Sequence, residues 1–170
     1  MFRQVFVIAS VLAALPVAQA QNVEQISKVQ SGLSCSGCNL FQADLAYRDL
    51  PGLDLSGSRL RQADLSLSTM NGVDFRATNL SVTNMFAGRF TGADFTNADL
   101  TNAVLVGSYL GGANLTGANL AGANLSGAEL TTAKGLTQAQ LDTACGDSAT
   151  LLPQGLTIPS CLNQNLRVSY

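Results

Sequence analysis

The four cysteines of this sequence are its most reactive residues, and they lie in two pairs of different spacing. Cys35 and Cys38 form a C-S-G-C motif, whereas Cys145 and Cys161 are sixteen residues apart. A C-x-x-C pair can pass between dithiol and disulfide, can bind zinc together with a second close pair, or can form a structural disulfide. Four cysteines allow three connectivities, so the motif alone leaves the pairing open.

The sequence contains no histidine, which excludes several kinds of site. Nucleophilic sites built on Ser/His/Asp or Cys/His need its imidazole, and Asn39 after the C-x-x-C motif excludes the C-x-x-C-H attachment of haem. The glycines follow a five-residue spacing and never form a phosphate-binding loop. We therefore expect a protein that is not an enzyme, with no catalytic residues, no metal and no bound cofactor.

The first twenty residues have the pattern of a secretory signal peptide. Arg3 precedes a short apolar run, and Ala18-Gln19-Ala20 is an A-x-A cleavage site. We predict a mature chain that begins near Gln21 and has no stable membrane span, with a retained membrane anchor as the alternative. The mature protein would lie in the periplasm or outside the cell, or in the thylakoid lumen if the source is a cyanobacterium.

A five-residue repeat separates the two cysteine pairs. Leu, Phe or Met occupies every fifth position from Leu40 to Leu130, nineteen times in succession. Ala or another small residue usually stands two positions earlier, and Asp or Asn one position earlier. A helix repeats every 3.6 residues and a strand every two, so neither element fits. We predict a coil with four pentapeptides per turn, apolar side chains inside and turns about 4.8 Å apart.

In this A-[DN]-L-x-x pattern, seen clearly at Ala113-Asn114-Leu115, the sequence resembles the pentapeptide-repeat family. The resemblance implies an all-β solenoid, a right-handed quadrilateral β-helix of about five turns, with a short helical or irregular C-terminal cap. The match is weakest between Leu50 and Phe90. We divide the chain into a signal peptide (1–20), an N-terminal cap (21–37), the β-helix (38–134) and a C-terminal cap and tail (135–170).

The predicted coil places the cysteines near its two ends. A rod of this length would hold the ends about 23 Å apart. We therefore favour a disulfide between Cys35 and Cys38 and another between Cys145 and Cys161, as expected in an oxidising compartment. A redox-active pair and a metal site are the alternatives. Thr137 and Gln140 have capping-box spacing and predict a helix start, with Gly146 as its stop.

Residues twenty apart should stack in columns, and one column is acidic. It contains Asp54, Asp74 and Asp94. Such a ladder of carboxylates could imitate a phosphate backbone or collect cations. The alternative is that Arg76 and nearby backbone amides compensate the charges, and that Asp is simply the usual residue of the repeat at this position.

Apolar side chains gather on a neighbouring side of the predicted coil. They occupy outward positions where the repeat elsewhere has Ser, Thr, Gly or Asn, and they are Tyr47, Leu67, Phe86, Val104 and Val106. Grouped exposed apolar residues indicate an interaction surface more strongly than scattered ones. We interpret them as a candidate face for a protein partner or for a second copy of the chain. The alternatives are that cap segments cover the face or that the repeat has decayed there without function.

Three functions from different classes fit these observations. We favour an exported, non-enzymatic scaffold that presents a rigid surface to a protein partner. Some pentapeptide-repeat proteins resemble DNA and bind type II topoisomerases, giving quinolone resistance. The signal peptide argues against this function, as does the modest charge of the mature chain, since eight Lys/Arg against eleven Asp/Glu give −3. The third is a thiol-disulfide oxidoreductase that uses Cys35 and Cys38. We expect no nucleic-acid partner.

Overall fold

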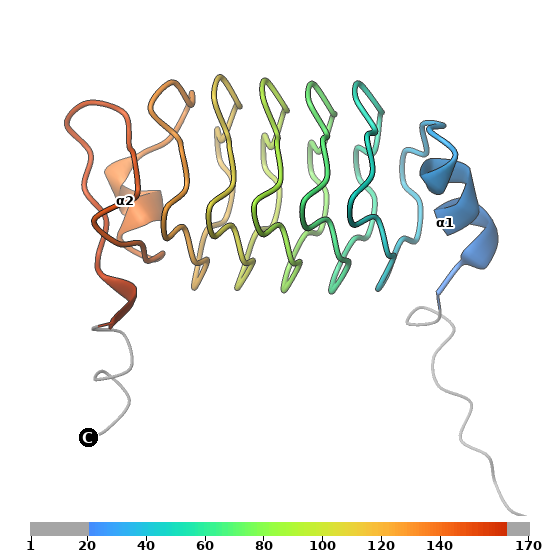
Figure 1. Cartoon of the computed structure of the whole chain (residues 1–170), viewed down its shortest axis with the longest axis horizontal. Coiled ribbons are helices and arrows are strands. Elements are labelled where there is room, and N and C mark those ends of the chain that lie inside the picture. The colour runs from blue at the N-terminus through green and yellow to red at the C-terminus, as the bar shows by residue number, and fades with distance from the viewer. Residues whose placement is uncertain (1–20, 163–170) are drawn as a thin grey trace, which may run out of the picture.

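The computed structural model of this protein describes residues 21–162. The predicted signal segment and the last eight residues of the tail lie outside the described residues. Figure 1 shows a coil of stacked turns with a helix at each end, α1 (Val23–Gln30) and α2 (Gln138–Leu141). Within residues 21–162, no helix is long and apolar enough to cross a membrane.

Successive turns of the coil are joined by parallel bridges between residues twenty apart. Asp54 pairs with Asp74, and Asp74 pairs with Asp94, as do the corresponding residues on the other three sides. Each side has one bridged residue between two corners, so pairing takes the form of isolated bridges rather than continuous strands. Five residues per side and twenty per turn give the four-sided β-helix that the repeat predicts.

The core of the coil is a stack of the residues that recur every five positions. All nineteen, from Leu40 to Leu130, are at most 4 % exposed. Three aromatic rings pack in the middle of the stack: Phe75 and Phe95 lie parallel with centroids 5.0 Å apart, and Phe90 meets both edge-on. Gly88 makes room for this group, because a Cβ atom there would lie 2.6 Å from the Phe90 ring.

Each corner of the coil depends on one residue with a left-handed backbone. The second corner residue has a positive φ throughout residues 37–127, and at nine of these corners it is not glycine. Leu67 (φ 56°) and Val82 (φ 58°) are two of the nine. This conformation is costly for side chains with a Cβ atom, so the coil's other interactions must impose it.

Where Asp or Asn precedes a core residue, it usually has a structural role at the corner that follows. Its side-chain oxygen accepts the N–H of the first corner residue, as Asp64 does from Ser66 (2.9 Å) and Asn124 from Ser126 (3.0 Å). The ladder between turns does not use this N–H. Asp and Asn are therefore favoured by the need to pair a backbone donor.

Both ends of the coil are covered. At the N-terminal end, α1 buries Ile26 and Val29 against the first turn, and Gln25 Oε1 accepts the N–H of Asn39 at 2.7 Å. At the other end, α2 begins with a capping box formed by Thr137 and Gln140. This helix ends at Leu141, before the predicted stop at Gly146, which instead pairs with Ser160 in a parallel bridge.

Candidate functional site

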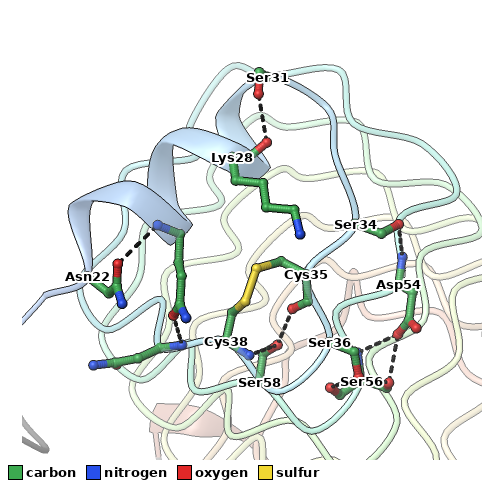
Figure 2. Close-up of a disulfide and its surroundings, with 12 residues drawn as sticks. Asn22, Lys28, Ser31, Ser34, Cys35, Ser36, Cys38, Asp54, Ser56 and Ser58 are labelled. Carbon is green, nitrogen blue, oxygen red and sulfur yellow. Dashed lines mark hydrogen bonds between the residues drawn. A yellow bond between two sulfur atoms is a disulfide. The ribbon is translucent and has the colours of Figure 1, made fainter.

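The Cys35–Cys38 disulfide fills core positions of the first turn of the coil. Cys35 occupies the position of a large core residue, twenty before Leu55, and Cys38 the position of a small one, twenty before Ser58. The Cα atoms are 5.6 Å apart, and the two cysteines are only 5 % and 6 % exposed. The disulfide thus replaces a Leu and Ala pair at the end of the core (Figure 2).

A hollow of about 430 Å³ lies between α1 and this disulfide. Both cysteines line it, together with residues of α1 and its N-cap: Asn22, Glu24, Gln25 and Lys28. Figure 2 shows the Lys28 side chain reaching from the helix toward the disulfide. An ammonium group in this position would favour a thiolate over a thiol if the disulfide were reduced. The hollow is therefore the place where thiol chemistry could reach the C-x-x-C motif.

The second disulfide, Cys145–Cys161, fastens the C-terminal segment to the last turn. Its Cα atoms are 4.8 Å apart. Cys145 continues the coil, because its N–H donates to the carbonyl of Ala123 and its carbonyl accepts from Leu125. Cys161 N–H donates to the Gly146 carbonyl at 2.9 Å. Among residues 21–162, no group of three or more His, Cys, Asp or Glu side chains is arranged to hold a metal ion.

The acidic column of Asp54, Asp74 and Asp94 is compensated within the chain. Asp74 is paired with the Arg76 guanidinium, whose hydrogen bonds hold the pKa of this carboxyl below its usual value. Asp54 accepts the hydroxyl and the N–H of Ser56, and the hydroxyl bond is the main cause of its lowered pKa. Asp94 is bonded in the same way by Thr96. These carboxylates serve the corners beside them.

The apolar face predicted from the sequence is exposed and continuous along the coil. We call it the apolar ridge, consisting of Tyr47 (78 % exposed), Leu67 (44 %), Phe86 (45 %), Val104 (39 %) and the half-buried Val106. Backbone hydrogen bonds connect its neighbouring turns: Leu67 N–H donates to the Phe86 carbonyl, and Ala87 N–H to that of Val106. The cap helices lie at the ends of the coil, so they do not cover its middle turns (Figure 1).

Two further exposed apolar side chains lie beside the ridge and were missed in the sequence. Val82 (44 % exposed) occupies the preceding corner, and Tyr109 (39 %) occupies the next side of the coil, where the Arg89 guanidinium lies 5.5 Å from the centre of its ring. Both stand at positions where the repeat elsewhere has polar residues or glycine. The same departure from the pattern that identified the ridge would have identified them.

A comparison with known protein families identifies the family to which this chain is related. The family described as pentapeptide repeats matches residues 38–81, 71–102 and 98–134, in eight copies. The chain belongs to the pentapeptide-repeat family. Its coil is accordingly a right-handed quadrilateral β-helix, as in the solved structures of this family. No curated protein matches the sequence.

Solved structures of other pentapeptide-repeat proteins resemble this one. A protein from the thylakoid lumen of Arabidopsis thaliana is 28 % identical, with a TM-score of 0.53, and the match covers 70 % of this chain and 81 % of that one. HetL, from the cyanobacterium Nostoc sp. strain PCC 7120 and involved in heterocyst differentiation regulation, is 26 % identical with a TM-score of 0.38, covering 76 % and 61 % of the two chains. QnrB1, a plasmid-mediated fluoroquinolone resistance protein, is 21 % identical with a TM-score of 0.40, covering 78 % and 73 %.

Proposed function

We propose that this pentapeptide-repeat protein is an exported, non-enzymatic scaffold that binds a protein partner along the apolar ridge. The main support for this proposal is that Tyr47, Leu67 and Phe86 are all exposed. They lie at the same corner of the coil, in three adjacent turns. Elsewhere the outward positions are mostly Ser, Thr, Gly, Asn and Asp. A contiguous apolar strip with polar surroundings is characteristic of interaction surfaces.

The coil suits this role because it is stiff. Its predicted length of about five turns is held by backbone hydrogen bonds between neighbouring turns and by a core of buried apolar side chains. The ridge residues are fixed on this frame, so a partner would bind with little loss of backbone entropy. Export is supported by the sequence of the first twenty residues and by the thylakoid-lumen origin of one relative.

The direct test is a crosslinking pull-down of the tagged mature protein from its native cell envelope. The Leu67→Asp, Phe86→Asp double variant places two charges on the ridge, and Asp tolerates the left-handed backbone at position 67. Thr116→Asp with Asn119→Asp adds the same charge elsewhere on the surface. We expect a partner with the wild type and the control but not with the ridge variant. Equal capture by all three would contradict the proposal.

A thiol-disulfide oxidoreductase is the second candidate. The observation that favours it is the hollow shared by Lys28 and the Cys35–Cys38 disulfide. In such a reaction a dithiol substrate would pass two electrons and two protons to the disulfide, leaving two thiols here and a disulfide on the substrate. An assay with reduced insulin and a Cys35→Ser variant would detect this activity. Turnover that is the same with Cys35→Ser as with the wild type would exclude these cysteines.

The DNA-mimic alternative has the weakest support. Its candidate feature, the acidic column, is compensated by Arg76 and by hydroxyl and amide donors. A DNA supercoiling assay with gyrase and the mature protein tests it directly. We expect no inhibition at micromolar concentrations, and inhibition that is lost with Asp54→Asn and Asp94→Asn would establish the mimic instead.

A further inference from the structure

We propose that the partner on the apolar ridge is a second copy of this chain, docked antiparallel about a two-fold axis. The inference rests on the proposed function, because it uses the same surface and names its occupant. It is carried by the order of side-chain sizes in the two columns of residues that form this corner of the coil, and by the charges on its flanks.

These two columns run along the coil with one residue in each turn, and their sizes change in opposite directions. In the column of second corner residues the side chains shrink steadily toward the C-terminal end: Tyr47, Leu67, Ala87 and Gly107. In the column of first corner residues the two small side chains come first and the two larger ones follow: Ala46, Ser66, Phe86 and Val106. The bridges between residues twenty apart keep both columns in register.

A two-fold axis can cross the corner perpendicular to the coil axis, halfway along these four turns. Each column of one copy then lies opposite the same column of the other copy, in reverse order. Tyr47 then lies opposite Gly107, and Leu67 lies opposite Ala87. In the other column Phe86 faces Ser66 and Val106 faces Ala46. Every large side chain meets a small one, as a self-complementary interface between identical chains requires.

The parallel orientation is less favourable because of charge. With the two coils parallel about a two-fold axis, each turn would meet the same turn of the other copy, and the columns on the two sides of the corner would exchange. Tyr47 would then face Ala46 and Phe86 would face Ala87, so side-chain size fits this arrangement too. On the flanks, however, Asp44 would face Asp49, which places two carboxylates opposite each other. The flanking charges therefore favour the antiparallel arrangement.

The column on one flank of the corner fits the same arrangement. Here Asp49 lies opposite Tyr109, whose hydroxyl can donate to the carboxylate, and Thr69 lies opposite Arg89. All four are exposed or half-buried. No two like charges face each other in this column, so charge does not oppose the contact.

The column on the other flank is polar at its centre. Asp64 lies opposite Asn84, and these two residues already form a hydrogen bond between turns of one chain, from Asn84 Nδ2 to Asp64 Oδ1 at 3.1 Å. Asp44 lies opposite Val104 at the end of the contact, in the first and last of the four turns, where the carboxylate can stay in water. Val104 therefore contributes least among the residues of the ridge.

The contact is narrow, and this sets its strength. Four turns at about 4.8 Å give a strip only about 15–20 Å long. Stable interfaces bury about 800 Å² on each partner, so we expect a reversible dimer with a dissociation constant on the order of 10–100 µM. Measurements must therefore include concentrations well above this range.

The test uses sedimentation of the mature protein over a series of concentrations, with variants that exchange two side chains. Ala87→Leu puts Leu against Leu67, and Leu67→Ala leaves a gap against Ala87. We expect each single change to raise the dissociation constant about tenfold, or about 1.4 kcal/mol. The double variant Leu67→Ala, Ala87→Leu restores a large residue opposite a small one, and we expect it to dimerise like the wild type.

The fold itself supplies the control for these variants. Positions 67, 77 and 87 have nearly the same left-handed backbone, with φ of 56°, 53° and 50°. Leu and Ala are therefore interchangeable there as far as the coil is concerned. Ala77 is exposed on a different corner, so Ala77→Leu should leave dimerisation unchanged.

Each result has a distinct meaning. A wild type that stays monomeric at every concentration overturns the dimer, but the proposed function stands if the pull-down still finds a ridge-dependent partner. A dimer that the double variant does not restore overturns the antiparallel register. Dimerisation that is insensitive to all ridge variants, with capture in the pull-down equally insensitive, overturns both proposals.

Discussion

Ser58 and Cys35 are joined across one turn of the coil, since Ser58 Oγ donates a 2.8 Å hydrogen bond to the Cys35 carbonyl oxygen. The same hydroxyl accepts the N–H of Cys38 at 3.0 Å. One buried side chain therefore holds both ends of the C-S-G-C corner without using sulfur. Corners of the same kind form further along the coil with no disulfide. The N-terminal disulfide is thus placed where the fold has little need of it.

The first prediction concerns the two disulfides. Cys35→Leu with Cys38→Ala gives this corner the usual residues of the repeat, and we expect the thermal midpoint to change by less than about 5 °C. Cys145→Ser with Cys161→Ser frees the C-terminal segment and should cost about 2–4 kcal/mol. Thermal melts of both variants check this. Failure of the first variant to fold would mean that its disulfide is essential.

Ser58 itself should be sensitive to change. Ser58→Ala leaves the Cys35 carbonyl and the Cys38 N–H without their buried partner, which should lower the free energy of unfolding by about 1–3 kcal/mol. Ser58→Thr is the control, because Thr78 in the next turn makes the corresponding bond to the Leu55 carbonyl at 3.0 Å. Urea unfolding would compare them. Equal loss in both variants would indicate a size effect rather than a lost hydrogen bond.

Gly88 and Phe90 form a pair that can be exchanged together. Gly88→Ala brings a Cβ atom within 2.6 Å of the Phe90 ring and should destabilise the coil by about 1–3 kcal/mol. Adding Phe90→Leu restores the common Ala and Leu combination of the repeat and should recover part of this loss. A double-mutant cycle measures the coupling. Additive effects would show that the two residues do not constrain each other.

Stability should fall in acid because of the acidic column. The pKa values of Asp54 and Asp74 are lowered in the folded chain, mainly by the Ser56 hydroxyl and by Arg76 respectively. A lowered folded pKa gives stability that is present above the unfolded value of about 3.9 and is lost as pH falls through the folded pKa. Urea midpoints from pH 7 to pH 2 should therefore drop below about pH 4. Asp74→Asn should reduce this drop, and an unchanged profile would assign it to other carboxyls.

The coil was predictable because a single physical pattern fixes it. Nineteen apolar residues at a spacing of five admit no other common element, and all nineteen are buried. The Asp or Asn that precedes most of them was visible too, but its bond to the corner N–H was not, because that bond depends on which amides the ladder leaves unpaired.

The C-terminal end was harder to predict because the spacing changes there. Cys145 pairs with Asn124 across twenty-one residues rather than twenty, since the short helix α2 takes up the extra residue at a corner. Leu151 pairs with Glu129 across twenty-two. A repeat of five cannot identify these partners. The hollow beside Cys35 was also invisible in the sequence, because it depends on how α1 lies across the first turn.

The helix α1 also determines where this molecule stops. Gln25 accepts the N–H of Asn39, and Gln30 donates to the carbonyl of Asp44, so two glutamine side chains occupy hydrogen-bonding groups on the outer rim of the first turn. A chain without this helix would present that rim to other molecules. Copies could then add end to end and grow into filaments of indefinite length. These two glutamine side chains thus help to stop copies of the coil from stacking end to end, so that the molecule keeps a fixed size.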